Sequence, residues 1–354
     1  VWTEVGPMLE ARSYHAAAML QSGDAWIVGG TRDGSSPKAA MAGAMRATER
    51  FDVGTDTFVA GPDLSFPRFA PTATTLSSGR VLVAGGDILG TADLCDPWLE
   101  HRLTSKALKL GQGMRVNHTA TLLPDGRVLL AGGSAVKLLP KPSARRLATT
   151  DIFDPKTRTF AAGPRLRHVR SGHAAALLHD GRVLLIGGVG RADCEVVDLR
   201  DIQPKVTTGP ALPQALDDLT ATTLADGRVL VLGGQVEGGR SVDRALLYTP
   251  GGAFVTLTAR MARPRSDHQA VLLADRGVLV LGGEADPGDG RKDRVLDAVE
   301  RFDPKTKRFT SWPSLPTPAD DHRAVRLLDG RILVTGGAGG SDIALDHAFV
   351  LHAR

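Results

Sequence analysis

The sequence predicts an all-β protein, a seven-bladed β-propeller in which each blade is a four-stranded antiparallel sheet. Three observations lead to this fold class. A Gly-Gly pair directly after a short apolar run recurs seven times in the 354 residues, and a further glycine stands before that run in every copy. Such regular recurrence is typical of a repeat architecture, which can exceed the size limit of a single hydrophobic core.

The Gly-Gly pairs set the phase of the repeat. The first pair begins at Gly29 and the last at Gly336, so the mean repeat is about 51 residues long. Runs such as 127–131 before a pair have the length and apolar character of a buried strand. The glycine six residues before the pair, as in Asp125-Gly126, predicts a hairpin turn. In the sixth copy this turn is shifted by one residue, to Asp275-Arg276-Gly277.

The outer strands follow from apolar segments that end in Phe-Asp. Third strands are predicted at 48–52, 150–155 and 299–304, and the fourth strands after them carry Phe58, Phe160 and Phe309. We expect a single propeller domain over 1–354, with blades that start near residues 12, 68, 115, 170, 216, 265 and 319. Residues 1–9 are expected to supply the fourth strand of the last blade, which would close the ring and hide its edge strands.

These motifs resemble those of a known family. The pattern Arg-x-x-His, then Leu-x-x-Gly-Arg-Val-Leu, then Gly-Gly, as in 115–133, is similar to the kelch repeat over essentially the whole chain, and to the propeller domain of galactose and glyoxal oxidases. The oxidase resemblance would imply a copper-radical centre of two tyrosines, two histidines and a cysteine bonded to one tyrosine. The sequence has only Tyr14 and Tyr248, and neither Cys95 nor Cys194 is expected in a loop that faces the channel. We therefore expect no copper-radical oxidase, no cofactor and no metal site.

In kelch domains the loop that enters the innermost strand and the loop after Gly-Gly form one face, and the resemblance implies that a ligand binds there. Arginines recur three residues before the repeated histidine, and a clustered arc of arginines suits carboxylate, sulfate or phosphate groups. Carboxylates occupy the neighbouring position in the later blades, so the mouth is expected to be electrically divided. The alternative is that the arginines bond loop carbonyls of the scaffold. The candidate ligand-binding residues are Arg12, Tyr14, Arg68, Arg115, Asn117, Arg170, Asp218, Arg265, Asp267 and Asp321.

The loops after Gly-Gly differ in length between copies. They are long in the first, third and sixth copies, at 31–47, 134–148 and 284–298. Walls of unequal height favour a pocket over a flat face, although surface loops also vary without function.

Three functions fit these features. The leading hypothesis is a non-catalytic recognition propeller that binds an acidic peptide, a protein, or an anionic or zwitterionic small molecule or glycan at the loop-lined face. The alternative is a cofactor-independent isomerase, lyase or cyclase that uses Asp267, Asp321, His268 and His322 as acid and base. A third possibility is a structural repeat domain of a larger secreted protein.

Composition narrows the partners. The net charge of +4 is spread along the chain without dense Lys/Arg runs, so we expect no nucleic-acid partner. No apolar stretch approaches the roughly 20 residues that span a bilayer, so no membrane partner is expected either. We expect a monomer with two buried thiols, and the sequence leaves the cellular compartment open.

Overall fold

The computed structural model describes residues 1–98, 107–137, 143–288, 290, 293–340 and 343–352. Seven four-stranded antiparallel sheets account for most of this part of the chain, which confirms the predicted seven-bladed propeller. The chain divides into two compact units. Unit 1 comprises Val1–Arg146, Asp151–Ala162 and Asp321–Arg354, and unit 2 comprises Leu147–Thr150 and Gly163–Asp320. Each is described separately below.

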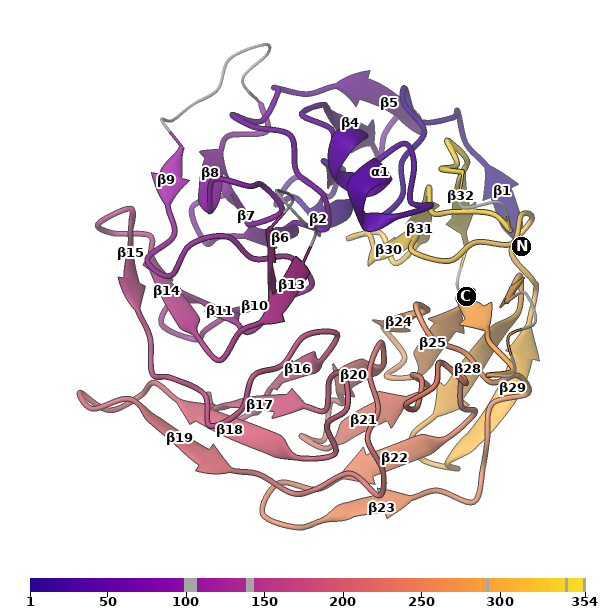
Figure 1. Cartoon of the computed structure of the whole chain (residues 1–354). Coiled ribbons are helices and arrows are strands. Elements are labelled where there is room, and N and C mark those ends of the chain that lie inside the picture. The colour runs from indigo at the N-terminus through magenta and orange to yellow at the C-terminus, as the bar shows by residue number, and fades with distance from the viewer. Residues whose placement is uncertain (99–106, 138–142, 289, 291–292, 341–342, 353–354) are drawn as a thin grey trace. The chain divides into compact units, whose positions relative to one another are not determined.

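Unit 1 contains four of the blades (Figure 1). Strands β30, β2, β6 and β10 are successive neighbours along its inner edge, while β1, β5, β9 and β15 are the outermost strands of the four sheets. In sheet order the strands are β30 (Arg323–Arg326), β31 (Ile332–Thr335), β32 (Ala348–Leu351) and β1 (Trp2–Glu4); β2 (Ala16–Met19), β3 (Ala25–Val28), β4 (Thr48–Asp52) and β5 (Thr57–Ala60); β6 (Thr72–Thr75), β7 (Val81–Ala84), β8 (Thr91–Cys95) and β9 (Leu108–Lys109); β10 (Thr119–Leu122), β11 (Val128–Ala131), β14 (Thr150–Asp154) and β15 (Thr159–Ala162).

Two smaller elements lie in the long loops of unit 1. The helix α1 (Pro37–Ala42) follows the first Gly-Gly pair, and a two-stranded sheet of β12 (Ser134–Lys137) and β13 (Ser143–Arg146) follows the third. The side chain of Ser36 caps α1 by accepting a hydrogen bond from the amide of Ala39, and Pro37 occupies the first turn, where its missing N–H has no helical partner to lose.

Unit 2 contains the other three blades, with β16, β20 and β24 as successive inner strands. In sheet order the strands are β16 (Ala174–Leu177), β17 (Val183–Ile186), β18 (Cys194–Asp198) and β19 (Lys205–Thr208); β20 (Thr220–Thr223), β21 (Val229–Leu232), β22 (Ala245–Tyr248) and β23 (Phe254–Thr256); β24 (Gln269–Leu272), β25 (Val278–Leu281), β28 (Val299–Asp303) and β29 (Arg308–Trp312). A short pair, β26 (Glu284–Ala285) with β27 (Arg294–Val295), follows the sixth Gly-Gly pair.

The hydrophobic core lies between neighbouring blades. Successive side chains of a strand point to opposite faces, so a strand with neighbours on both faces is apolar at every position. In β21, Val229 and Val231 pack in the cluster shared with the β16–β19 blade, whereas Leu230 and Leu232 pack in the cluster shared with the β24–β29 blade. This explains why the run before each Gly-Gly pair is continuously hydrophobic.

The Gly-Gly pairs are required by backbone conformation and by close packing. Gly29 and Gly30 have φ of 62° and 96°, which side chains other than glycine rarely adopt. A Cβ on Gly30 would lie 2.6 Å from the carbonyl oxygen of Ser13 and 2.9 Å from the Cβ of His15. The amide of Gly30 donates to the carbonyl of Arg68 in the next blade at 2.9 Å, so the pair also connects blades.

Several detailed expectations are confirmed. The N-terminal strand β1 pairs antiparallel with β32, with Trp2 opposite Leu351. The third strands agree with their predicted ranges within one residue at β4, β14 and β28. Cys95 and Cys194 are buried free thiols, and burial raises the pKa of the Cys194 thiol to about 12.

Among the described residues, no helix is long and apolar enough to cross a membrane.

Candidate ligand site on the loop face

The five repeated arginines of the entering loops are fully buried. Nη1 of Arg265 donates to the carbonyls of Gly282 at 3.0 Å and Ala298 at 2.9 Å, and Nη2 donates to Glu300 at 2.7 Å. The other four bond the first glycine of their own Gly-Gly pair in the same way, with Arg12 on Gly29, Arg68 on Gly85, Arg115 on Gly132 and Arg170 on Gly187.

These contacts correct the interpretation of the arginines as ligand anchors. A guanidinium that is buried and held by its own blade presents no surface to a ligand, so the geometry supports the alternative, a scaffold role, for Arg12, Arg68, Arg115, Arg170 and Arg265. The predicted division of the mouth into cationic and acidic arcs does not form either, because each of these arginines pairs with a carboxylate. The pairs are Arg12–Glu49, Arg68–Asp93, Arg115–Asp151, Arg170–Glu195 and Arg265–Glu300.

A signal in the sequence could have identified this role. In four of the five blades the partner carboxylate stands at the second position of the third strand, as Glu49 does in β4 and Glu300 in β28, and in the remaining blade Asp93 stands at the third position of β8. In the fifth blade the arginine position holds Leu216 and the carboxylate position holds Leu246, and both leucines belong to one hydrophobic cluster. Arginine occurs together with a carboxylate and leucine with leucine, as expected for residues in contact.

The residue just before each repeated histidine position has a left-handed backbone. The φ values at Tyr14, Asn117, Asp218, Asp267 and Asp321 lie between 47° and 51°, and Ala70 and Gly172 share this conformation at 49° and 61°. Asn, Asp and Gly tolerate this region best, so part of the carboxylate pattern reflects backbone conformation.

Backbone hydrogen bonds connect these left-handed residues from blade to blade. In unit 1 the amide of Tyr14 donates to the carbonyl of Asp321, and the amide of Ala70 donates to the carbonyl of Tyr14. In unit 2 the amide of Asp218 donates to the carbonyl of Gly172, and the amide of Asp267 to that of Asp218. The candidate residues Tyr14, Asp218, Asp267 and Asp321 therefore line the entering-loop ends of the inner strands.

The repeated histidines belong to the scaffold. Nε2 of His268 lies 2.9 Å from the hydroxyl of Thr220 in the preceding blade, and Nε2 of His15 lies 3.0 Å from that of Thr335. His268 and His322 are buried, and burial holds the pKa of His15 well below its ordinary value. Asp267 and Asp321, which precede these two histidines and have left-handed backbone conformations, are half-buried.

One acidic side chain of unit 2 has a distinctive environment. Asp218 accepts a hydrogen bond from the side-chain Nε2 of Gln235 at 2.9 Å, and burial raises the pKa of its carboxyl group. A carboxyl group with a raised pKa could serve as a proton donor. Asp218 does not line any described pocket, however, so its surroundings fit a structural hydrogen bond as well.

A pocket of about 440 Å³ opens on the loop face of unit 1. Its lining includes the candidate residues Tyr14 and Asn117, together with Phe69, whose ring centroid lies 4.9 Å from that of Tyr14. The other walls come from the long loops of the first and third copies: Gly34, Ser36, Lys38 and Ala40 at α1, and Val116, Ser134, Val136, Ser143 and Ala144 at β12 and β13. Uneven loops thus form a pocket, as expected from their lengths.

The pocket combines an apolar interior with one positive charge. Lys38 is exposed and is the only charged residue in the described lining, and no described residue forms an ion pair or hydrogen bond with its ammonium group. Hydroxyl groups of Ser36, Ser134 and Ser143 and the amide of Asn117 add polar contacts. Sequence reasoning missed Lys38 and Phe69 because neither stands at a repeated polar position.

The tyrosines and cysteines do not fit a copper-radical centre. Tyr248 lies in β22 with its ring against Phe254, 5.3 Å between centroids, and its hydroxyl accepts a hydrogen bond from the amide of Gly251. Cys95 and Cys194 are buried within third strands and not in entering loops.

One group of metal-type ligands occurs in the described residues, outside the pocket. Ligand atoms of His168, Asp193 and Glu195 lie within 4.8 Å of one another. Both carboxylates already bond Arg170, at 2.9 and 2.6 Å, and Arg191 bonds Asp193 at 2.6 Å. These guanidinium groups hold the charge that a cation would otherwise neutralise.

Comparison with known proteins shows similarity of fold. No family model matches the sequence, and no curated protein matches it. Among solved structures, a fungal alcohol oxidase of the AA5 family in complex with copper matches with a TM-score of 0.77 and 18% identity, over 99% of this chain and 76% of that one. The structure of YjhT matches with a TM-score of 0.62 and 11% identity, over 99% and 97% of the two chains. At these identities the likeness establishes the fold that the three proteins share, the β-propeller.

Proposed function

We propose that this protein is a kelch-repeat propeller that binds a small anionic or zwitterionic ligand in the loop-face pocket of unit 1, without catalysing a reaction. The single observation that carries the proposal is the pocket itself, in which the Tyr14–Phe69 pair and one unpaired ammonium group face the same space of about 440 Å³. Pockets for small ligands are typically of this size, mostly apolar, with a few polar groups that fix orientation.

The lining suggests the chemistry of the ligand. Aromatic rings suit the apolar face of a sugar or of another ring, and an ammonium group suits a carboxylate. We infer a ligand with a compact carbon body and one acidic group, such as a sugar acid or an aromatic acid. The serine hydroxyls and Asn117 would bond its remaining polar atoms.

The catalytic alternative lacks an observation of its own. His268 is buried against Thr220, and neither His268 nor His322 lines a described pocket. Proton transfer needs the acid or base within hydrogen-bond reach of the substrate, and this geometry does not provide it.

Calorimetric titration with two matched pairs of compounds tests the proposal: glucuronate against glucose, and benzoate against benzamide. We expect at least one acid to bind roughly 10-fold more tightly than its neutral partner, a difference of about 1.4 kcal/mol. Lys38→Ala should abolish this preference, because the ammonium group supplies it.

Two further variants complete the test. Tyr14→Asn keeps a residue that tolerates left-handed φ and should weaken binding of acid and neutral compound alike. Lys205→Ala removes one exposed lysine from unit 2, outside both hollows, and should leave the titration unchanged. Equal binding of acids and neutral compounds by the wild type, or an acid preference that survives Lys38→Ala, would contradict the proposal.

A further inference from the structure

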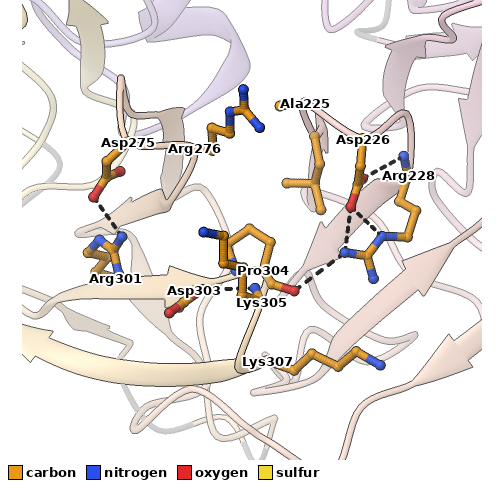
Figure 2. A pocket seen from close by; sticks show the side chains of 11 residues that line it. Ala225, Asp226, Arg228, Asp275, Arg276, Arg301, Asp303, Pro304, Lys305 and Lys307 are labelled. Carbon is orange, nitrogen blue, oxygen red and sulfur yellow. Dashed lines mark hydrogen bonds and ion pairs between the residues drawn. The ribbon is translucent and has the colours of Figure 1, made fainter.

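A second hollow lies in unit 2, at the opposite strand ends from the Gly-Gly loops. It has a volume of about 570 Å³ and is bounded by the turns β20–β21, β24–β25 and β28–β29 (Figure 2). We call it the turn-face groove. Its position in another unit makes it independent of the ligand site proposed above.

The side chains of the turn-face groove carry a surplus of positive charge. Five cations line it, against three carboxylates: Arg228, Arg276, Arg301, Lys305 and Lys307, with Asp226, Asp275 and Asp303.

All three carboxylates have partners already. Asp226 pairs with Arg228 and Asp275 with Arg301, each at 2.6 Å, and Asp303 accepts the amide of Lys305 at 2.8 Å. Figure 2 shows no such contact for the charged groups of Arg276 and Lys305. The backbone amide does not cancel the charge of Asp303, so the lining keeps a net charge of +2, with Arg276, Lys305 and Lys307 as the cations that form no ion pair among the described residues.

One equivalent place in unit 1 shows how such charge can be neutralised. There Nη1 of the turn arginine Arg331, the counterpart of Arg228, donates to both carboxylate oxygens of Asp56 at 2.8 and 2.9 Å, and Nη2 donates to the carbonyl of Val53. Asp56 and Lys307 are the fifth residues of corresponding turns, and both have φ of 55°. The corresponding turn of the third blade has Arg158 at the same position.

In the turn-face groove lysine thus replaces the acid. In the next blade, Arg228 contacts the carbonyl of Pro304 at 3.4 Å. The carboxylate that Asp56 offers to Arg331 in unit 1 has no equivalent beside Arg228 in the part of the chain that the structure describes.

The turn β24–β25 adds a second unusual feature. The order Asp275-Arg276-Gly277 places an arginine where other copies have glycine, and Arg276 adopts a φ of 72°. The glycine stands one residue later, at Gly277, where a Cβ would lie 2.8 Å from the movable guanidinium of Arg301. The strained Arg276 extends at the rim of the groove between the two neighbouring turns (Figure 2). Backbone strain of this kind is concentrated at functional sites.

We propose that the turn-face groove binds a phosphate ester, whose phosphate group takes the place that the carboxylate of Asp56 holds in unit 1. Arg276, Lys305 and Lys307 donate to the phosphate oxygens, and Arg228 faces the same group. The volume exceeds that of a bare phosphate, and Leu224, Ala225 and Pro304 offer apolar surface for a small organic body. Arginine and lysine are the common partners of phosphate.

The test is calorimetric titration with phenyl phosphate and inorganic phosphate at pH 8 and constant ionic strength. We expect the wild type to bind phenyl phosphate. Lys307→Asp should weaken binding at least 10-fold, because it rebuilds the Arg331–Asp56 arrangement inside the groove. The substitution suits the fold, since Asp56 occupies the same conformation.

Two variants separate this effect from misfolding and from general charge. Arg276→Gly removes a cation and relieves the left-handed arginine, so it should weaken binding without lowering the melting temperature. Lys205→Asp makes the same charge change at an exposed position of unit 2 outside the groove and should leave affinity unchanged.

The outcomes decide between the alternatives. Undiminished binding by Lys307→Asp, equal weakening by Lys205→Asp, or no binding of either phosphate compound at about 10 mM by the wild type would overturn the proposal. Lys38→Ala should leave phenyl phosphate binding unchanged, so failure at one site does not imply failure at the other.

Discussion

The buried pair Arg265–Glu300 offers a direct test of how the blades are built. The substitution Arg265→Leu removes the donor to the carbonyls of Gly282 and Ala298 and leaves Glu300 almost fully buried without its counter-charge. Breaking one side of a buried ion pair destabilises a protein by about 3–5 kcal/mol. Glu300→Leu leaves the guanidinium of Arg265 unpaired and should be similarly destabilising.

The double variant should be much less destabilised than the sum of the two. The fifth blade already has leucine at both positions, Leu216 and Leu246, within one hydrophobic cluster. The remaining loss comes from backbone groups such as the amide of Ala262, which donates to Glu300 at 2.9 Å, at about 1–3 kcal/mol for each group left without a partner. We therefore expect the double variant to fall short of additivity by about 1–3 kcal/mol.

Urea unfolding of the four proteins of this cycle, followed by tryptophan fluorescence and circular dichroism, measures this coupling. Additivity within about 0.5 kcal/mol, the behaviour of independent sites, would refute the assignment of Arg265 and Glu300 as a unit. A destabilisation by Arg265→Leu of under about 1 kcal/mol would do so as well, because surface arginines behave in that way.

Two more predictions follow from the fold. Gly30→Ala should destabilise far more than Gly126→Ala: both have positive φ, worth about 1–2 kcal/mol, but a Cβ on Gly30 would lie 2.6 Å from a carbonyl oxygen and one on Gly126 meets nothing within 4 Å. Equal unfolding midpoints for the two variants would contradict this. Burial holds the pKa of His15 below its ordinary value of 6.5, so the folded protein binds fewer protons there. The stability linked to His15 should be complete above pH 6.5 and decline as pH falls below it, and His15→Leu should flatten this decline in melting temperature. An unchanged slope would count against the assignment.

Much of the fold could be predicted because the same pattern of glycines and apolar runs occurs in seven copies. The spacing of Gly-Gly pairs gave the phase, and continuous apolar runs such as Val229–Leu232 marked strands buried on both faces. The helix α1 also had a readable signal that the prediction did not use, with Ser36 as cap, Pro37 in the first turn and Gly43 at its end.

The candidate site was predicted only in part. Tyr14 and Asn117 line the loop-face pocket, because the entering loops do lead to it. The arginines were assigned to the surface because a sequence shows the charge of Arg115 but not the distance to Asp151, which lies 36 residues further along. Lys38 and the turn-face groove depend on loops and turns that depart from the repeat, so periodicity could not reveal them.

The sequence alone determined the number of blades, the strands within each blade and the pairing of the N-terminal strand with the last blade, since these depend on local spacing and hydrophobic pattern. Tertiary structure decided which charges are free. A buried guanidinium is stable only when a carboxylate and carbonyls surround it, and those partners come from distant strands. Because Glu300 lies beside it, Arg265 can be buried and is not exposed to a ligand. Among the described residues Lys307 has no such carboxylate partner, and it lines the turn-face groove, where we propose that it binds a ligand.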